Sequence, residues 1–168
     1  RQMQKGPEYF VEAAARVLAK KRDVRFVMAG SGDKMDEMIR LVAEKRISDR
    51  FHFTGFMKGR QVYEVYHASD VYVMPSVSEP FGITPLEAMQ CGVPCIISKQ
   101  SGCSEILTYA IKLDYWDVDA MADAMYALVT YPALHDLLSQ RGLDEVAGIT
   151  WDKVALKIRG LYDQVLGR

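Results

Sequence analysis

The sequence has few of the features that mark secreted, membrane-spanning or zinc-binding proteins. Its three cysteines, Cys91, Cys95 and Cys103, are odd in number and show no C-x-x-C spacing, which disfavours both a disulfide framework and a zinc site. No apolar run approaches the roughly 20 residues of a membrane span. The opening R-Q-M-Q-K-G lacks the apolar segment of a signal peptide. Because reduced thiols are typical of the cytosol, we expect a cytoplasmic protein.

The chain also lacks an excess of charge of either sign. Its formal net charge of -1 disfavours bulk nucleic-acid binding, which needs a basic face. The dense basic run, residues 20 to 22, falls at the end of a predicted helix, where it complements the helix dipole. A length of 168 residues predicts a single domain spanning 1–168, and 49% apolar with 26% charged residues is ordinary for a globular protein.

Complete motifs for phosphate binding, hydrolysis and metal binding are missing as well. The full G-x-G-x-x-G is absent because position 35 is Met, and there is no Walker motif. None of the histidines has a Ser or Cys partner at a recognisable spacing. No His/Asp/Glu cluster has the spacing of metal ligands. The sequence therefore predicts neither a Ser-His or Cys-His hydrolase nor a metal centre.

What the sequence does contain is a regular alternation of helical and extended patterns. Short apolar runs predict strands at 24–29, 51–54, 71–74 and 95–98. Stripes at helical spacing precede them and predict helices at 7–20, 35–45, 61–68 and 84–91. This order predicts a Rossmann-like α/β fold, a three-layer parallel sheet with helices on both faces. Beyond residue 113 a helical cover is expected, with helices at 117–130, 133–141 and 151–166.

Loops that contain glycine follow the carboxyl ends of these strands, where open α/β sheets bind ligands. They are Gly30-Ser31-Gly32, Gly55 to Lys58, Pro75 to Gly82 and Ser98 to Gly102. The G-S-G loop fits a phosphate cradle, but a lone G-x-G is a weak signal and a tight strand-to-helix turn explains it better. Lys5 and Lys58 are placed to reach an anion across such a cleft, or else are ordinary solvated lysines.

The stretch S-E-P-F-G-I-T-P-L-E, residues 78 to 87, supports two interpretations. Thr84 at the N-cap, Pro85 at N1 and Glu87 at N3 fit a capping box, which would account for Glu87 entirely. The loop before it offers backbone N–H groups that suit a phosphate. Glu79 is explained by neither; a carboxylate there suits a sugar hydroxyl or a developing positive charge.

The longer segment S-E-P-F-G-I-T-P-L-E-A-M-Q-C-G-V-P-C-I resembles the E-x7-E signature of family 4 retaining glycosyltransferases and of related glycogen and starch synthases. Other landmarks of that family follow in matching order. They are K-G at 5–6, R-F-V-M-A-G-S-G at 25–32, F-T-G-F at 53–56, S-G-C-S-E at 101–105 and W-D-K-V-A at 151–155. The resemblance covers essentially the whole chain.

This resemblance implies one half of a GT-B fold, in which two facing Rossmann-like domains enclose the active site. The chain is then the C-terminal domain that binds the nucleotide-sugar, without the N-terminal acceptor-binding domain, and would be inactive alone. In the family, the first Glu of the motif lies near the donor sugar, which gives Glu79 the catalytic position. The second Glu holds the ribose hydroxyls, which gives that role to Glu87. The remaining donor contacts that the resemblance implies are Lys5, Gly30, Gly32, Phe56, Met57, Lys58, Phe81, Gly82, Ile83 and Thr84.

The implied reaction is sugar transfer from a UDP-, ADP- or GDP-hexose with retention of anomeric configuration and without a metal or another cofactor. The departing phosphate takes the acceptor proton, and Lys5 and the loop amides stabilise its charge. Two departures from the family pattern stand out: S-G-C-S replaces the usual G-G near the sugar, and Arg1 lies closer to Lys5 than the family's phosphate-binding Arg. A GT-B epimerase or phosphorylase, or a non-catalytic α/β binding module, remain the alternatives.

Overall fold

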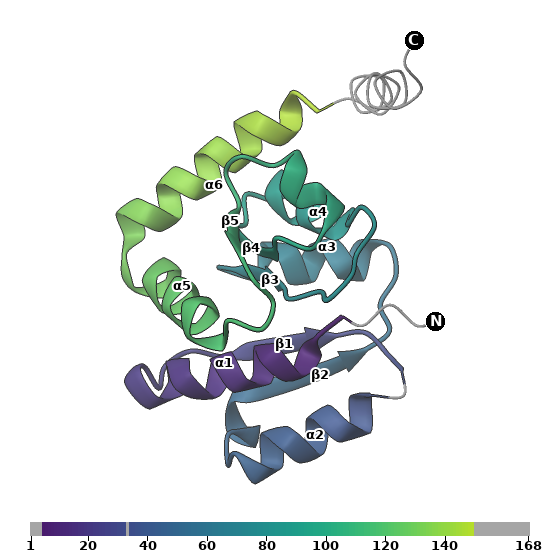
Figure 1. Ribbon diagram of the computed structural model, residues 1–168, viewed down its shortest axis with the longest axis vertical. Coiled ribbons are helices and arrows are strands. Elements are labelled where there is room, and N and C mark those ends of the chain that lie inside the picture. Colours follow the sequence, from purple (N-terminus) through teal and green to yellow (C-terminus); the bar gives the residue numbers. More distant parts are fainter. Residues whose placement is uncertain (1–4, 33, 150–168) are drawn as a thin grey trace.

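A computed structural model describes residues 5–32 and 34–149 of the chain (Figure 1). The strands are β1 (Phe26–Ala29), β2 (Phe51–Gly55), β3 (Tyr72–Met74), β4 (Cys95–Ser98) and β5 (Ile111–Leu113). The α-helices are α1 (Pro7–Lys20), α2 (Met35–Glu44), α3 (Arg60–His67), α4 (Thr84–Gln90), α5 (Val118–Thr130) and α6 (Pro132–Ala147). Short 3-10 helices, η1 and η2, lie at Ser48–Arg50 and Gly102–Glu105. The predicted helix at 151–166 lies outside the described residues.

The strands pair in parallel, as the alternation of helices and strands predicts, but they form two hydrogen-bonded sheets. One sheet contains β1 and β2, whose register pairs Phe26 with Phe51. The other has the order β3-β4-β5. The sequence did not predict β5, because its three residues I-K-L, with an exposed Lys112 in the middle, are too short to carry a recognisable pattern.

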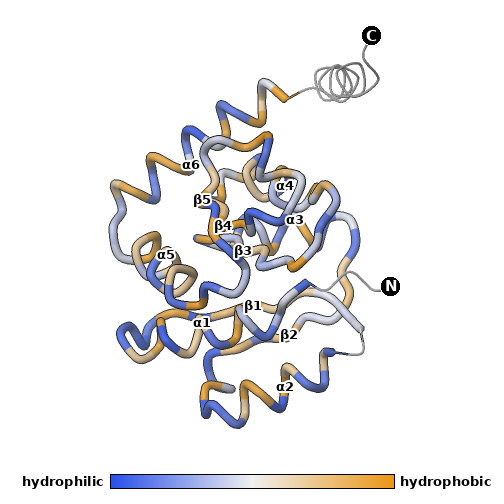
Figure 2. The backbone as a smooth tube through the Cα atoms, in the orientation of Figure 1, coloured by the Kyte–Doolittle hydropathy of each residue, from blue (hydrophilic) through white to orange (hydrophobic). Residues whose placement is uncertain are grey.

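The core consists of two apolar clusters. One joins α1, α2 and α5 to β1 and includes Val11, Val17, Met38 and Met121. The other lies around α4 and the β3-β4-β5 sheet and includes Met89 and Ile97. Figure 2 shows polar and apolar stretches alternating along the helices, so that each helix buries one side and exposes the other. No helix within the described ranges is long and apolar enough to cross a membrane.

Two helices differ from their predicted form. The pattern of α2 predicts Met35, Met38, Ile39 and Val42 on the inner face; Met38 and Val42 are buried, whereas Ile39 is 44% exposed. Helix α6 continues past the predicted end at residue 141. It does so because Gly142 is buried at the contact with α4, where an added Cβ would lie 3.0 Å from Met89 Cε. Gly142 thus lets two helices pack closely and does not mark the end of a helix.

Candidate functional site

The loop between β3 and α4 is held by backbone pairing beyond the ends of the strands. Glu79 forms a parallel β-bridge with Ser101. The Gly102 N–H donates to Glu79 O at 2.9 Å, and the Cys103 N–H donates to Phe81 O at 2.7 Å. An added Cβ on Gly102 would lie 2.0 Å from Pro80 O, so the two loops approach this closely only because Gly102 has no side chain. This pairing fixes the backbone from which the Glu79 side chain projects.

Buried serines tie together the carboxyl ends of β3 and β4. Ser98 Oγ donates to Ser76 O at 2.6 Å, and Ser101 Oγ donates to Ser98 O at 2.6 Å. Ser104 Oγ donates to Lys99 O at 2.9 Å. All of these hydroxyls belong to buried residues, so their bonds form away from competing water. Sequence reasoning placed Ser98 and Ser101 in a predicted ligand-binding loop, and Ser101 and Ser104 in the S-G-C-S-E motif, but it did not predict these hydrogen bonds.

The predicted capping box at α4 is wrong. Ile83, the residue before the helix, already has helical φ and ψ angles of -73° and -33°, and no side chain caps the first turn. The two predicted capping side chains have other partners. Tyr72 Oη donates to Thr84 Oγ1 at 2.7 Å, and Tyr66 Oη donates to Glu87 Oε2 at 3.4 Å. Phenol hydroxyls from β3 and α3 therefore bond the two side chains that a capping box would direct at the backbone.

The backbone amides before α4 lack protein partners. In the part of the chain that the structure describes, the N–H groups of Gly82, Ile83 and Thr84 donate to no protein acceptor. Gly82 has a left-handed φ of 81°, and an added Cβ there would lie 3.1–3.3 Å from Met74, Cys103 and the Glu79 side chain. Glycine is therefore required both by the backbone conformation and by the space. The amides remain available to a ligand.

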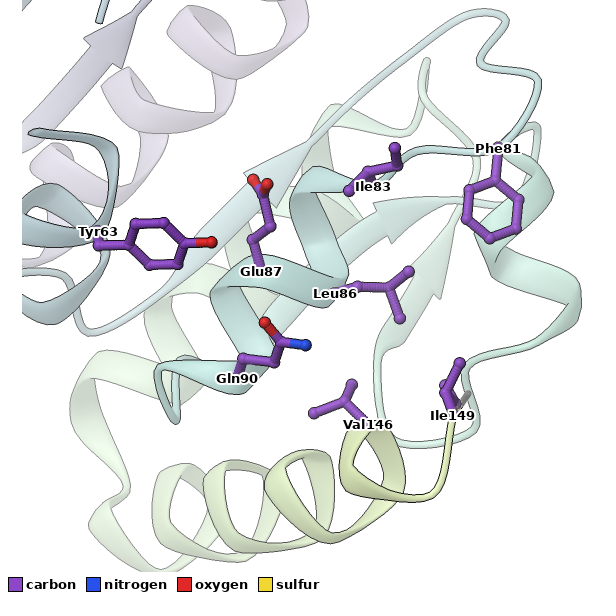
Figure 3. A pocket seen from close by; sticks show the side chains of 8 residues that line it. All are labelled: Tyr63, Phe81, Ile83, Leu86, Glu87, Gln90, Val146 and Ile149. Carbon is purple, nitrogen blue, oxygen red and sulfur yellow. The ribbon is translucent and has the colours of Figure 1, made fainter. Parts of the chain in front are cut away.

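The Glu87 carboxylate borders a pocket of about 220 Å³ at the side of α4 (Figure 3). The Tyr63 phenol points toward Glu87 from α3. Leu86 of α4, Val146 of α6 and residues that flank these helices supply apolar side chains to the rest of the wall. The lining residues are Tyr63, Phe81, Ile83, Leu86, Glu87, Gln90, Val146 and Ile149. The pocket therefore combines one carboxylate with a mainly apolar surface, which is typical of small-molecule sites.

Burial keeps the phenol beside Glu87 protonated. Tyr66 is 7% exposed. Burial raises its pKa well above the usual range, and the neighbouring Tyr72 and the Glu87 carboxylate raise it further. The phenol is consequently a hydrogen-bond donor at every physiological pH. An ionised carboxylate only accepts hydrogen bonds, so the pair is chemically matched.

Glu79 borders a different pocket, of about 370 Å³, which shares no lining residue with the first. Its lining is polar and comes from the loops after β3 and β4: Ser78, Glu79, Pro80, Lys99, Gln100, Ser101, Gly102 and Glu105. Asp114 organises this wall, because it accepts from Lys99 Nζ and from Gln100 Nε2, each at 3.0 Å. These bonds hold the pKa of the Asp114 carboxyl below its usual range. The motif thus places its carboxylates in separate pockets.

Lys5 is exposed and adjoins this loop through its neighbour. Gly6, at the start of α1, packs so closely on the end of β3 that an added Cβ would lie 2.2 Å from Pro75 O. Its left-handed φ of 59° likewise favours glycine. The structure therefore brings the start of α1 to the carboxyl end of β3, as the predicted cleft requires.

The remaining predicted donor contacts lie elsewhere. The Gly30 N–H donates to Gly55 O at 2.9 Å, which joins the ends of β1 and β2. The Phe56 ring is 66% exposed, and Lys58 Nζ lies 5.3 Å from its centroid. Of the predicted donor contacts, those that line neither pocket are Lys5, Gly30, Gly32, Phe56, Met57, Lys58, Gly82 and Thr84. Their contact with a donor stays a prediction.

Within 5–32 and 34–149, no group of three or more His, Cys, Asp or Glu side chains is placed to hold a metal ion. Cys91, Cys95 and Cys103 are all free thiols. Burial raises the pKa of the Cys95 and Cys103 thiols, which disfavours the thiolate that nucleophilic chemistry needs.

Comparison with known proteins decides the family. The family model described as glycosyl transferases group 1 matches residues 2–142. The chain belongs to this family. One relative of this chain is the α-D-kanosaminyltransferase of Streptomyces kanamyceticus, which is 30% identical over 166 residues. The match covers 96% of this chain and 43% of that protein. The chain spans less than half the length of the curated relatives it matches.

Solved structures agree with this assignment. The C-terminal domain of a group 1 glycosyl transferase from Francisella tularensis superimposes with a TM-score of 0.78 at 27% identity, covering 88% of this chain and 80% of that domain. The Anabaena protein HepE in complex with UDP-glucose superimposes with a TM-score of 0.78 at 19% identity, covering 85% of this chain and 40% of that one. The latter likeness concerns the fold alone. The predicted GT-B type of α/β domain is thus confirmed.

Proposed function

We propose that the chain is the donor-binding half of a retaining glycosyltransferase, and that its ligand is a nucleotide-diphospho-sugar. The observation that carries this proposal is the placement of the two motif carboxylates in a group 1 chain. Glu87 faces a half-apolar pocket beside α4, and Glu79 faces a polar pocket after β3 and β4. A nucleoside is less polar than a sugar, as the Glu87 pocket is less polar than the Glu79 pocket. One nucleotide-sugar that spans the loop can therefore occupy both pockets.

Glu87 is assigned to the ribose hydroxyls. Its carboxylate has an oxygen, Oε1, that no protein group engages among the described residues, and ionised carboxylates accept hydroxyl donors strongly. The apolar wall formed by Ile83 and Leu86 suits the less polar faces of a nucleoside. Glu79 is assigned to the donor sugar, whose hydroxyls match a polar wall that contains Lys99 and Ser101.

Catalysis in this proposal is electrostatic. The amides of Gly82, Ile83 and Thr84 lie between the two pockets along the chain and have no protein acceptor within the described segments. Together with Lys5 they would stabilise the departing diphosphate. The leaving phosphate oxygen takes the proton of the attacking acceptor hydroxyl, and the acceptor attacks on the face that the phosphate leaves. The glycosidic bond to phosphate breaks as the bond to the acceptor forms, so the scheme requires no metal or other cofactor.

The acceptor and the second wall of the cleft are assigned to a separate domain. A cleft needs both walls to orient its substrates and exclude water, so the chain alone should bind a donor without efficient transfer. The free state of all three cysteines supports a reducing compartment such as the cytoplasm. The resemblance of the central motif to family 4 retaining glycosyltransferases, and to related glycogen and starch synthases, suggests a hexose donor.

Calorimetric titration of the 168-residue chain with UDP, ADP and GDP, each also as its glucose conjugate, tests the proposal. We expect saturable binding of one base in preference to the others. Asp123→Asn, a change at an exposed carboxylate of α5 that pairs with Lys20, serves as a control that leaves binding unchanged. Lack of binding of all three nucleotides at millimolar concentration would overturn the proposal and favour a non-catalytic module.

A further inference from the structure

Tyrosine rings from two elements flank the first turn of α4. Tyr63 and Tyr66 on α3 pack edge to face with ring centroids 6.4 Å apart, and Tyr66 packs in the same way on Tyr72 of β3 at 5.8 Å. The exposed fraction of Tyr63 is 43%, whereas that of Tyr66 is 7%. The middle ring is therefore wedged between its neighbours, and its hydroxyl has little freedom to move.

Two of these phenols each hold one polar side chain of the turn. Tyr72 donates to Thr84 Oγ1 at the start of α4, and Tyr66 donates to Glu87 Oε2. Thr84 in turn points its hydroxyl toward Met74 Sδ at 3.8 Å. Both polar side chains of the turn are thus anchored from outside the helix.

We propose that Tyr66 is a positioning residue for Glu87: its hydroxyl holds Oε2, so that Oε1 is aimed at the ligand's ribose diol. The inference rests on the proposed function and names the part of the ligand that this carboxylate recognises. A glutamate side chain has several rotatable bonds, and fixing them before binding removes an entropic cost of roughly 0.5–1.5 kcal/mol. An ionised carboxylate is an acceptor only, so Glu87 selects ligands that present hydroxyl donors at this point.

The chemistry of the phenol supports this role. The hydroxyl stays protonated because burial raises its pKa, so it keeps the proton that it donates to Glu87. Phenylalanine at position 66 would keep the ring and its two edge-to-face contacts while removing one oxygen. The substitution therefore separates the hydrogen bond from the packing.

The test compares the binding of UDP with that of 2′,3′-dideoxy-UDP, which lacks both ribose hydroxyls. Tyr66→Phe should weaken UDP binding about 3- to 10-fold, the loss expected for one hydrogen bond, and leave dideoxy-UDP binding unchanged. Tyr126→Phe on α5, whose ring lies beside Lys20 far along the chain from this pocket, should change neither affinity. The thermal midpoint of each variant shows that the fold is retained.

A second measurement tests whether Tyr66 acts through Glu87 or contacts the ligand directly. In a Glu87→Ala background, Tyr66→Phe should have no further effect on UDP binding. A loss that adds fully to that of Glu87→Ala would show direct ligand contact and overturn the positioning role. Equal weakening of UDP and dideoxy-UDP by Tyr66→Phe, or no weakening at all, would overturn it too.

The remaining outcomes separate this role from the proposed function. If the unsubstituted chain binds UDP and dideoxy-UDP equally, Glu87 does not recognise the ribose diol. The positioning role of Tyr66 is then overturned, whereas the proposal of nucleotide binding is retained. If the unsubstituted chain binds no nucleotide, the proposed function is overturned and the role falls with it.

Discussion

Glu79 and Ser101 form a parallel β-bridge beyond the carboxyl ends of β3 and β4. The bridge continues the pairing of two strands that have already ended, and it brings the loops after both strands into one rigid unit. The polar pocket lies on this unit, with Glu79 and Glu105 among its lining residues. Rigid backbone beneath a reacting group favours catalysis, because small displacements of the group are costly to the rate.

Removing the space that this bridge needs should destabilise the fold. Gly102→Ala places a Cβ 2.0 Å from Pro80 O, and backbone on both sides must shift. We expect a loss of about 1–3 kcal/mol in the free energy of unfolding, measured by urea denaturation. Gly148→Ala is the matched control, since its Cβ would lie 3.4 Å from the nearest atom, and it should change stability by less than about 0.5 kcal/mol. Equal stability of the two variants would show that the loops separate freely.

Glu87→Gln should weaken nucleotide binding without destabilising α4. The carboxylate does not cap the helix, so its removal costs no cap. It accepts a hydrogen bond that a neutral amide accepts less strongly, and a loss of about 1.5–3 kcal/mol in binding is expected for a charged acceptor. Calorimetry measures the nucleotide affinity, and a thermal melt on the same sample measures the stability of the fold. Reduced stability with unchanged affinity would instead indicate that Glu87 is purely structural.

Glu79→Gln should impair turnover more than donor affinity in the complete transferase that we propose. A carboxylate near the reacting sugar stabilises charge that develops only in the transition state, so its loss lowers kcat and kcat/KM together. Steady-state kinetics with the donor varied at saturating acceptor separate the two constants. A rise in KM with unchanged kcat would mean that Glu79 only binds the sugar.

Alkaline pH should destabilise the fold through Tyr66. Its pKa is raised in the folded state above the ordinary value of 10.0, chiefly by burial, so the unfolded chain loses the phenol proton first. The stabilising contribution is complete below about pH 10 and is lost as the pH rises through the folded-state value. Tyr66→Phe should therefore show a smaller fall in unfolding free energy between about pH 8 and pH 11. An identical fall in both proteins would contradict the burial of this phenol.

Much of the fold follows from local patterns in the sequence. Helix α1 was predicted with its observed bounds because an apolar stripe begins at Pro7, and the strand β4 was predicted because C-I-I-S is continuously apolar. The end of α6 was missed because Gly142 looks like a helix end until its contact with Met89 is known. The division into two sheets likewise depends on long-range pairing, which periodicity does not encode.

The position of the site was predicted from the sequence, but the hydrogen bonds within it were not. The motif located Glu79 and Glu87 at a strand end and a helix start, where α/β folds bind ligands. The capping box failed because Thr84 and Glu87 meet Tyr72 and Tyr66, which come from β3 and α3. Partners that lie 12 and 21 positions away in the chain leave no trace in a local motif. For the same reason the separation of the carboxylates into two pockets was not foreseen.

The most direct measurement of the central claim is a map of backbone amide chemical shifts during a titration with UDP. The account predicts that the perturbed amides cluster in the loop from Glu79 to Thr84, in the first turn of α4 around Glu87, and in residues 99–105. It also predicts that Glu87→Ala abolishes the perturbations at α4 under the same conditions. Perturbations confined to other surfaces, such as α5 and the start of α6, or a map unchanged by Glu87→Ala, would contradict it.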